Sequence, residues 1–349
     1  ILLVVILAVV FLVIPVRLDR SMNVVEGNLD TQGVSETAWK MHRKLAIVDL
    51  HADPLLWKRD LLARNDHGHV DLPRHEEGNV AIQVLAAVTK TPAGQNYDSN
   101  SGDSDRITGL AMVNLQPVNT WFSLFERSVF HARKLERFAA AEPERLTMIE
   151  TPEHVSALIT ARRESGAPVG ALLAVEGLHN LEGDLENLDG LYRAGYRMVG
   201  LAHFFDNEVA GSMHGEEKYG LTDLGRQVVD RAEQLGMLID LAHSSPAAIE
   251  DVLNMATRPV VVSHGGVKAT CGVNRNLSDR QLRKIASGGG LIGIGYWDAA
   301  VCDNSPAGIV DAIDHVRTLV GIDHVALGSD FDGAVTTRFD TTGLVLLTQ

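Results

Sequence analysis

The sequence has few cysteines and no excess of positive charge, and both shortages narrow what the protein can be. Its two cysteines, Cys271 and Cys302, are too few for a disulfide framework and lack the Cys-x-x-Cys spacing of a structural zinc or redox site. We expect two free buried thiols, with one mutual disulfide as the alternative. The net charge of −14 leaves no basic stretch that could displace counterions from a phosphate backbone, which argues against nucleic acid as a partner.

The sequence also lacks internal repeats, low-complexity tracts and interdomain linkers. Its hydrophobic share of 45% and charged share of 22% are those of an ordinary globular protein, so a large packed core is expected. A chain of 349 residues can form one large domain, and α/β barrels often have this length. We expect an acidic protein of this kind to act on small molecules.

One long hydrophobic run stands at the start of the sequence. Residues 1–16 contain no charged side chain and approach the length that spans a bilayer, and no small-residue cleavage site clearly follows them. We interpret residues 1–18 as a transmembrane anchor or signal segment and residues 19–40 as a stalk or linker. The protein would then be attached to a membrane through its N-terminal segment.

From residue 47 onward, apolar runs of strand length alternate with longer segments that carry helix boundary signals. Ser245, Ser278 and Ser305 stand where N-cap residues are expected, and two of them are followed by a proline in the first helical turn. This alternation predicts repeated β-α units, and eight such runs would close an α/β fold of the (β/α)8 TIM-barrel type. The predicted strands are residues 47–50, 81–88, 170–175, 197–201, 237–241, 260–263, 291–294 and 324–327.

The predicted barrel domain covers residues 41–349. Its segment 89–150 is too long for a simple crossover, so we expect a loop over residues 91–105 and then a long helix around residues 115–141. Few residues follow the last predicted strand. We therefore interpret the closing helix as missing or barely begun, and the domain as truncated at its C-terminus.

Potential metal ligands or proton-transfer groups follow six of the eight predicted strands. His51 and Asp53 come at the end of the first strand, where alternation places both side chains on one face. A single histidine after a strand is more often a core or loop residue than a ligand. Because barrel enzymes place their active sites at these strand ends, the joint pattern favours one common site. The other members of the pattern are Glu176, His203, His243, His264 and Asp330.

The donor types indicate a hydrolytic metal centre. Imidazole and carboxylate without thiolate suit zinc, manganese or iron in a catalytic site better than a structural zinc site. The set is too large for one ion, and it divides naturally if Glu176 bridges two ions. His51 and Asp53 would then bind one ion and the pair His243 and His264 the other. Two ions about 3.5 to 4 Å apart can share a hydroxide and polarise a carbonyl.

Several motifs, in the same order along about residues 40–335, resemble the renal (membrane) dipeptidase family, the zinc dipeptidases of peptidase family M19. The motifs are VEGLH at 175–179, LIDLAHS at 238–244, VSH at 262–264, NRNLSD at 274–279 and GSDFDG at 328–333. The residues around His51 and after His264, namely Leu50, Ala52, Gly265 and Gly266, depart from the family's usual pattern and could alter the pocket's shape.

The resemblance implies a (β/α)8 metallohydrolase that holds two Zn²⁺ ions per chain, cleaves dipeptides including L,D-dipeptides, and forms a homodimer. The family's first zinc site falls on His51 and Asp53, its bridging carboxylate on Glu176, and its second site on His243 and His264. Its substrate-binding histidine falls on His203, its carboxylate-binding arginine on Arg275, and its acid after the eighth strand on Asp330.

The chemistry of the three remaining residues agrees with these roles. The planar guanidinium of Arg275 can hold a terminal carboxylate through two hydrogen bonds, although it could also be a surface arginine. His203 can donate to an oxyanion, or pack as a strand-end histidine. Asp330 can orient the attacking hydroxide and carry its proton to the leaving amine.

Other polar residues near the predicted strand ends receive lesser roles. Asp332 suits an Asx-turn and is left out of the site. Asp49, His179 and Asp240 are candidates for orienting the ligand histidines. We treat the remaining histidines as non-functional because they lie at surface-like or unpatterned positions; they are His67, His69, His75, His131, His154, His214, His315 and His324.

The leading hypothesis is therefore a membrane-anchored, dinuclear zinc dipeptidase whose catalytic domain lies outside the cytoplasm and whose metal-bridged hydroxide attacks the peptide bond of a small dipeptide. One alternative keeps the barrel and the metals but acts on lactams, lactones or N-acyl amino acids. A second alternative is a catalytically silent barrel displayed on the membrane.

Overall fold

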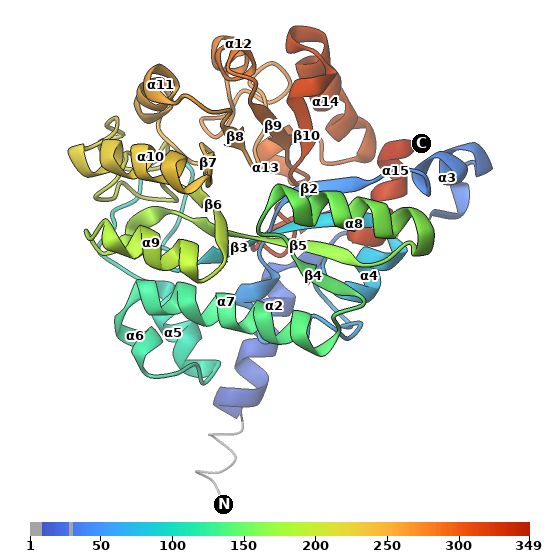
Figure 1. Cartoon of the computed structure of the whole chain (residues 1–349), viewed down its shortest axis with the longest axis horizontal. Coiled ribbons are helices and arrows are strands. Elements are labelled where there is room, and N and C mark those ends of the chain that lie inside the picture. Colours follow the sequence, from blue (N-terminus) through green and yellow to red (C-terminus); the bar gives the residue numbers. More distant parts are fainter. Residues whose placement is uncertain (1–8, 28–30) are drawn as a thin grey trace, which may run out of the picture.

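The structure is a computed structural model that describes residues 9–27 and 31–349. Eight parallel strands form a ring in the order β3-β2-β10-β9-β8-β7-β6-β5, and the pairing of β3 with β5 closes it (Figure 1). The predicted (β/α)8 barrel is confirmed. The strands are β2 (Ile47–Ala52), β3 (Val80–Val88), β5 (Val169–Glu176), β6 (Tyr196–Gly200), β7 (Leu238–Asp240), β8 (Val261–Val262), β9 (Leu291–Ile294) and β10 (Val325–Leu327).

The strands form because they are short apolar segments that the fold buries on both faces. All nine residues of β3 are buried, as expected for a strand with helices on one side and the barrel interior on the other. A cluster of strand residues that includes Leu50, Ala174 and Met198 fills the interior. Ala174 precedes Glu176 by two residues, so strand alternation directs Glu176 into the top of the same interior.

Helices surround the ring and carry the predicted boundaries. Ser245, Ser278 and Ser305 each cap a helix by accepting a backbone hydrogen bond through the side chain, as predicted. The outer helices are α8 (Pro152–Ser165), α9 (Glu186–Arg193), α10 (Asp223–Leu235), α11 (Pro246–Met255), α12 (Asp279–Ser287) and α14 (Pro306–Val320).

The insertion between β3 and β5 differs from its prediction. In place of one long helix around residues 115–141, the chain forms α5 (Arg106–Val113), α6 (Asn119–Phe122) and α7 (Leu124–Ala141). The break before α7 occurs because Ser123 takes an extended backbone and caps α7 by accepting from the Glu126 N–H. A short strand that was not predicted, β4 (Leu146–Met148), pairs with the beginning of β5.

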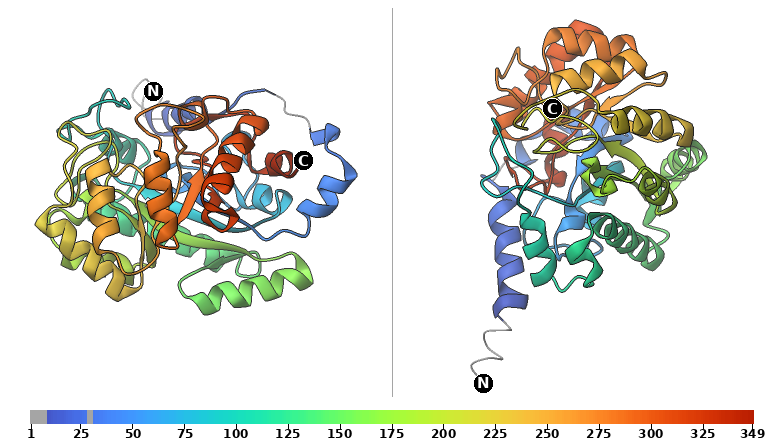
Figure 2. Two further views of the ribbon diagram at one scale, coloured as in Figure 1. Left: turned by 90° about the horizontal axis from the view of Figure 1, so that it is seen from above. Right: turned by 90° about the vertical axis from the view of Figure 1, so that its left-hand side faces the viewer.

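The N-terminal segment reaches the barrel through the end of α2 (Ile14–Met22) and through β1 (Val24–Val25), whereas η1 (Val9–Val13) extends away from it (Figures 1 and 2). The π-helical turn η1 leads into α2, and β1 pairs with β11 (Thr336–Thr337). Asp19 of α2 is buried, and its carboxylate accepts from the guanidinium of Arg59 at 2.8 Å.

These elements cover much of the predicted anchor and stalk. Among the described residues, no helix is long and apolar enough to cross a membrane. Residues 1–8 of the predicted anchor lie outside the described residues. Residues 19–40 were expected to be a stalk, but within them α3 (Glu36–His42) packs against the short last helix α15 (Val345–Thr348). α2 and α3 therefore pack on the domain, whereas η1 buries none of its residues.

The expectation of two free thiols is wrong, because Cys271 and Cys302 form a disulfide. Cys271 lies in the loop after β8, and Cys302 follows α13 (Asp298–Val301), which comes after β9. Because β8 and β9 are neighbours in the ring, the loops at their carboxyl ends meet, and the two Cα atoms are 5.3 Å apart. The separation of 31 residues hid this proximity in the sequence.

One buried histidine predicts how stability should depend on pH. Burial, with a smaller contribution from nearby Lys134, lowers the pKa of His131 on α7 to about 3. The unfolded chain therefore binds this proton first, and stability is lost as the pH falls below about 6.5. We expect His131→Leu to remove roughly 2 kcal/mol of the loss between pH 7 and pH 5, measured by urea unfolding at both values.

The matched control is His154→Leu, because His154 is exposed on α8. This substitution should leave the difference in unfolding free energy between the two pH values as it is in the parent protein. An equal effect of both substitutions would show that the ring of His131 is solvated in the folded state.

Candidate functional site

The carboxyl ends of the strands bring the predicted metal ligands together, and all of them except His51 line one cavity of about 560 Å³. His51 lies near the end of β2 and Asp53 follows that strand, whereas Glu176 is the last residue of β5. His243 and His264 stand two or three residues beyond β7 and β8, in the loops above the ring. All five side chains are buried, with exposed fractions of 6% or less.

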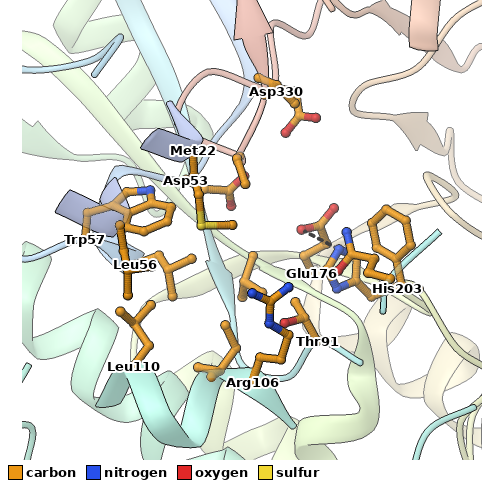
Figure 3. A pocket seen from close by; sticks show the side chains of 18 of the residues that line it. Met22, Asp53, Leu56, Trp57, Thr91, Arg106, Leu110, Glu176, His203 and Asp330 are labelled. Atoms are coloured by element: carbon orange, nitrogen blue, oxygen red, sulfur yellow. Dashed lines mark ion pairs between the residues drawn. The ribbon is translucent and has the colours of Figure 1, made fainter. Parts of the chain in front are cut away.

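Glu176 is the centre of this cluster. Its Oε1 atom lies 2.8 Å from Nε2 of His243, 3.3 Å from Nε2 of His264 and 3.8 Å from Nε2 of His51. Its Oε2 atom lies 3.3 Å from Nε2 of His203 (Figure 3). The carboxylate therefore faces imidazole nitrogens on both oxygens, which is the position predicted for a bridging ligand.

Two further carboxylates lie beside His51. The Nε2 atom of His51 is 3.2 Å from Oδ2 of Asp53 and 4.0 Å from Oδ1 of Asp330. Three groups of possible metal-ligating atoms, each within 4.8 Å of one another, overlap at this centre. The groups are His51 with Glu176 and His264, Glu176 with His203 and His243, and His51 with Asp53 and Asp330.

The electrostatics of the cluster favour a bound cation. Burial raises the pKa of Glu176 well above its usual value, and Asp53 adds to the rise although His51 opposes it. Burial, again opposed by His51 and supported by Asp53, raises the pKa of Asp330 to about 8. A divalent cation would remove this penalty on ionised carboxylates and use the converging imidazole nitrogens. The residues present therefore fit a metal centre.

A buried carboxylate orients two of the histidines through a serine. The Ser263 hydroxyl donates to Oδ2 of Asp240 at 2.5 Å and lies 2.9 Å from Nδ1 of His264 and 3.3 Å from Nδ1 of His51. Because its single proton is donated to Asp240, the hydroxyl oxygen can only accept from the two rings. The Nδ1 atoms then carry the protons, and both Nε2 lone pairs face the cavity.

The other two candidates for orienting ligands act differently. Asp49 accepts from the backbone N–H groups of His51 and Ser329, so it fixes the β2 and β10 strand ends rather than an imidazole ring. His179 places Nε2 2.9 Å from the Thr89 hydroxyl and contacts no predicted ligand ring. Of the three residues proposed from the sequence, Asp240 is the one that orients ligand rings, and it does so through the Ser263 hydroxyl.

Backbone conformations that side chains rarely adopt occur at two site residues. His243 and Asp330 have φ values of 62° and 61°, in the left-handed region where a β-carbon is disfavoured. Such strain persists where the surrounding structure holds it and is concentrated at functional sites. Gly333 provides the space beside Asp330, since a β-carbon there would lie 2.0 Å from its Oδ1 and 2.8 Å from Oδ2 of Asp53.

Arg275 is a buried cation whose charge has no carboxylate partner within 4.0 Å among the described residues. Its Nη2 atom donates to the His264 carbonyl at 3.0 Å, its guanidinium lies 5.7 Å from the centre of the Trp297 ring, and its Nε atom has no hydrogen-bond partner there. Burial lowers the pKa of Arg275, partly offset by Asp330. The side chain lines the same cavity as Glu176, so it can receive an anion there.

Aromatic residues that sequence reasoning did not select hold the histidines in place. His214, dismissed as non-functional, is fully buried, stacks on Phe204 with ring centres 4.8 Å apart, and lies edge-on to His243 at 5.3 Å. Its Nδ1 atom is 2.9 Å from the Tyr97 carbonyl, and Tyr97 itself lines the cavity. The spacing of His214 from a strand gave no signal, because its loop folds back over the ring.

Not every dismissed histidine is at the surface: His69, His75 and His131 are buried as well, but none of them belongs to the groups of possible metal-ligating atoms. Asp332, left out of the site, accepts from the backbone N–H of His69 at 2.8 Å and pairs with Arg59 at 2.7 Å. It thus stabilises the loop that follows β10 and does not face the cavity.

The wall opposite the ligand cluster is apolar (Figure 3). Leu18 and Met22 of α2, Leu56 and Trp57 after β2, and Leu110 of α5 supply it, and Arg106 reaches in from the start of α5. Neither α2 nor α5 follows a barrel strand directly, so the rule that selected the ligands could not select this wall. Hydrophobic side chains at helical spacing gave no signal that they line a cavity.

A closed β/α barrel with buried imidazoles and carboxylates at the carboxyl ends of its strands is the arrangement of a metallohydrolase. The chain belongs to the membrane dipeptidase family, peptidase family M19, whose model matches residues 35–342. The resemblance seen in the motifs is therefore confirmed.

Similar proteins include Dipeptidase tcpJ of Claviceps purpurea (strain 20.1), which is 29% identical over 303 residues, covering 84% of this chain and 64% of that protein. The chain spans between 41% and 65% of the length of the curated relatives it matches. Among solved structures, dipeptidase AC, a metallopeptidase of family M19, is 25% identical with a TM-score of 0.71, over 87% of this chain and 90% of that one.

A second solved structure is a metallopeptidase from Rhodobacter sphaeroides, liganded with a phosphinate mimic of the dipeptide L-Ala-D-Ala. It is 25% identical to this chain, with a TM-score of 0.70 over 87% of this chain and 91% of that one. Both structures share the barrel described above.

The serine that orients the histidines gives a testable expectation. Ser263→Ala should weaken the affinity for a divalent metal ion, tested with Zn²⁺, by roughly 10- to 100-fold. The reason is that the substitution removes the hydroxyl oxygen that keeps a proton on Nδ1 of His264 and His51. Affinity would be measured by competition with a chromophoric chelator, independently of any activity. Ser244→Ala is the control, since Ser244 is equally buried beside His243 but its hydroxyl has no hydrogen-bond partner among the described residues. Equal affinities of the two variants would exclude the orienting role.

Proposed function

We propose that the protein is a metal-dependent dipeptidase that uses two zinc ions and accepts dipeptides with an L- or D-residue at the C-terminal position. The observation that carries this proposal is the buried guanidinium of Arg275 beside the ligand cluster, which has no carboxylate partner among the described residues. Its Nη2 atom is 3.4 Å from Nε2 of His243. A cation at that distance from the reaction centre suits a substrate whose free carboxylate is one residue away from the bond that is cleaved. Family membership and the dipeptide mimic bound by the Rhodobacter sphaeroides relative support it.

The five proposed metal ligands can be divided between two ions. His51 and Asp53 would hold one ion, His243 and His264 the other, and Glu176 both, since its oxygens lie among all the imidazoles. Two zinc ions would supply a water of lowered pKa and polarise the scissile carbonyl. Zinc fits because the donors are imidazole and carboxylate, and thiolate is not among them.

The protein's own groups perform the remaining steps. Arg275 binds the terminal carboxylate and so fixes the position of the peptide bond over Glu176. His203, on the other side of Glu176, donates a hydrogen bond to the oxygen that becomes negatively charged when the carbonyl is attacked. Asp330 takes the proton of the attacking water and delivers it to the leaving amine. Burial of these groups excludes bulk water from the reaction.

The cellular placement is part of the proposal. We infer that the domain lies outside the cytoplasm and is held at a membrane by its N-terminal segment. The Cys271–Cys302 disulfide supports this location, because disulfides persist in oxidising compartments. The uncharged residues 1–16 support attachment. A homodimer, expected from the family resemblance, is kept as a proposal and would be tested by measuring the mass of the protein in solution.

A second candidate substrate class is supported by the apolar wall. N-acyl amino acids also carry a carboxylate that Arg275 could bind, and an acyl chain could lie against Leu18, Met22 and Leu110. Comparing hydrolysis of a dipeptide with that of an N-acylated amino acid of equal length decides between the two classes. Zinc-loaded protein that hydrolyses neither substrate would revive the silent barrel.

The role of Arg275 can be separated from general damage to the site. Arg275→Lys should lower kcat/KM for a dipeptide by roughly 30-fold, because lysine keeps the charge but loses the second hydrogen bond to the carboxylate, which is worth about 2 kcal/mol. For the same dipeptide with an amidated C-terminus, the substitution should change kcat/KM little, since no carboxylate is present.

The control is Arg280→Lys, because the Arg280 side chain is 78% exposed on α12. It should leave kcat/KM for both substrates at the parent value. A loss of equal size for the free and the amidated dipeptide in Arg275→Lys would contradict carboxylate recognition.

Removal of metal tests the centre as a whole. Dialysis against a chelator should abolish dipeptide hydrolysis, and Zn²⁺ should restore it. Glu176→Gln should lower the zinc content measured by elemental analysis, since Glu176 is shared by both ligand groups in the proposed division. The exposed Glu153→Gln on α8 serves as control. Full zinc content and full activity in Glu176→Gln would exclude the bridging role.

A further inference from the structure

Exposed hydrophobic side chains gather on two segments at one end of the molecule. More than half of the exposed large hydrophobic residues in the described part of the chain lie within residues 9–18 and 112–122. Both views in Figure 2, with Figure 1, place α2 and η1 beside α5 and α6, and α2 contacts α5. The exposed residues are Val9, Leu12, Val13, Ile14, Val16, Leu18, Met112, Leu115, Val118 and Phe122. We call them the apolar end.

The α5–α6 connection presents its part of the apolar end rigidly. Leu115 and Val118 are each 60% exposed and Phe122 is 80% exposed. Between them, the Trp121 indole donates to the Gln116 carbonyl at 3.1 Å, and buried Arg127 of α7 donates to the Thr120 carbonyl at 2.5 Å. The side chains thus point to the outside because the connection is held from the inside.

The charge distribution of the two segments differs from that of the rest of the chain. Residues 9–18 and 106–122 contain no acidic side chain, although the chain has 45 acidic residues and a net charge of −14. Exposed basic residues border the apolar end instead: Arg17, Arg106 and Lys58, whose Nζ donates to the Phe11 carbonyl at 3.1 Å. An apolar surface with a basic border is complementary to the headgroup and acyl boundary of an anionic membrane.

We propose that the apolar end is a lipid-docking face, with η1, α2 and the α5–α6 connection entering the interfacial layer of a phospholipid bilayer. Continuity of sequence selects this occupant over a protein partner, because the uncharged residues 1–16 run directly into α2. Phe122 and Trp121 are residues of the kind that lie at membrane interfaces. The proposal does not depend on the reaction that the metal centre performs.

Docking in this way would fix the orientation of the barrel. α2 and α5 display Val16 and Met112 outward, while Met22 and Leu110 of the same helices line the cavity. The apolar wall of the cavity would then lie next to the lipid surface, and the metal ligands would lie on the side away from it. Amphipathic substrates would reach the site from the membrane without crossing an acidic surface.

The test uses the full chain in vesicles of phosphatidylcholine and phosphatidylglycerol. Because the native cysteines are joined in a disulfide, a nitroxide label attaches selectively to a new thiol in Val118→Cys or in the control Ile322→Cys. The two sites are matched, with exposed fractions of 60% and 61%, but Ile322 lies in η5 (Ile322–His324) outside the apolar end. Bound zinc and unchanged unfolding temperature confirm that both labelled proteins are folded.

The expected result is a shift at residue 118 alone: relaxation of the label by oxygen, which concentrates in lipid, rises relative to relaxation by a water-soluble nickel complex. The label at residue 322 should report water. Equal, aqueous ratios at both sites would overturn the proposal. Dipolar broadening between labels at residue 118 of two chains, without the shift towards oxygen, would also overturn it, because it would assign the face to a second copy of the chain.

Discussion

The site depends on one electrostatic constraint, the burial of several carboxylates and imidazoles around Glu176. Its two oxygens lie 2.8 to 3.8 Å from the Nε2 atoms of four histidines, and Asp53 and Asp330 adjoin His51. Burial alone would drive such carboxyl groups towards their protonated forms and such histidines towards their neutral forms. Divalent cations reconcile the two, since they favour ionised carboxylates and neutral imidazoles at once. The donor set therefore makes chemical sense as a metal centre and is costly without one.

The barrel holds these buried polar side chains in place partly through its strands and partly through the loops that follow them. Strands β2 and β5 deliver His51 and Glu176 from a rigid core, because their neighbouring residues are packed in the barrel interior. His243 and Asp330 come from loops and occupy left-handed backbone conformations that the surrounding structure must hold. The Asp240–Ser263 hydrogen bond then fixes the rings of His51 and His264 from beneath. The strands therefore fix where the site lies, and the strained loops fix how the side chains of His243 and Asp330 are oriented.

The sequence was sufficient for the features that have a fixed period or a fixed place on the strands. The eight strands were predictable because each is a short apolar run between capped helices. The meeting of the candidate ligands was predictable because they stand at strand ends. The Cys271–Cys302 disulfide, the buried position of His214 and the apolar wall from α2 and α5 were not, since each depends on which loops meet above the ring. Contacts between loops depend on the tertiary fold and follow no sequence periodicity, so local sequence patterns do not predict them.

The N-terminal helix and the active-site loop are connected by one buried ion network. Arg59 contacts Asp19 of α2 at 2.8 Å and Asp332 at 2.7 Å, and Asp332 follows Asp330 by two residues. The Arg59 cation offsets the burial of Asp332 and holds the pKa of that carboxyl well below its usual value. A buried charge network of this kind contributes little net stability but strongly disfavours arrangements that leave one charge unpaired. Because α2 also lines the cavity, the position of the N-terminal helix, the loop that carries Asp330 and the shape of the pocket are settled together. The segment that reads as an anchor in the sequence contributes Ile14 and Leu18 to one wall of the candidate active site.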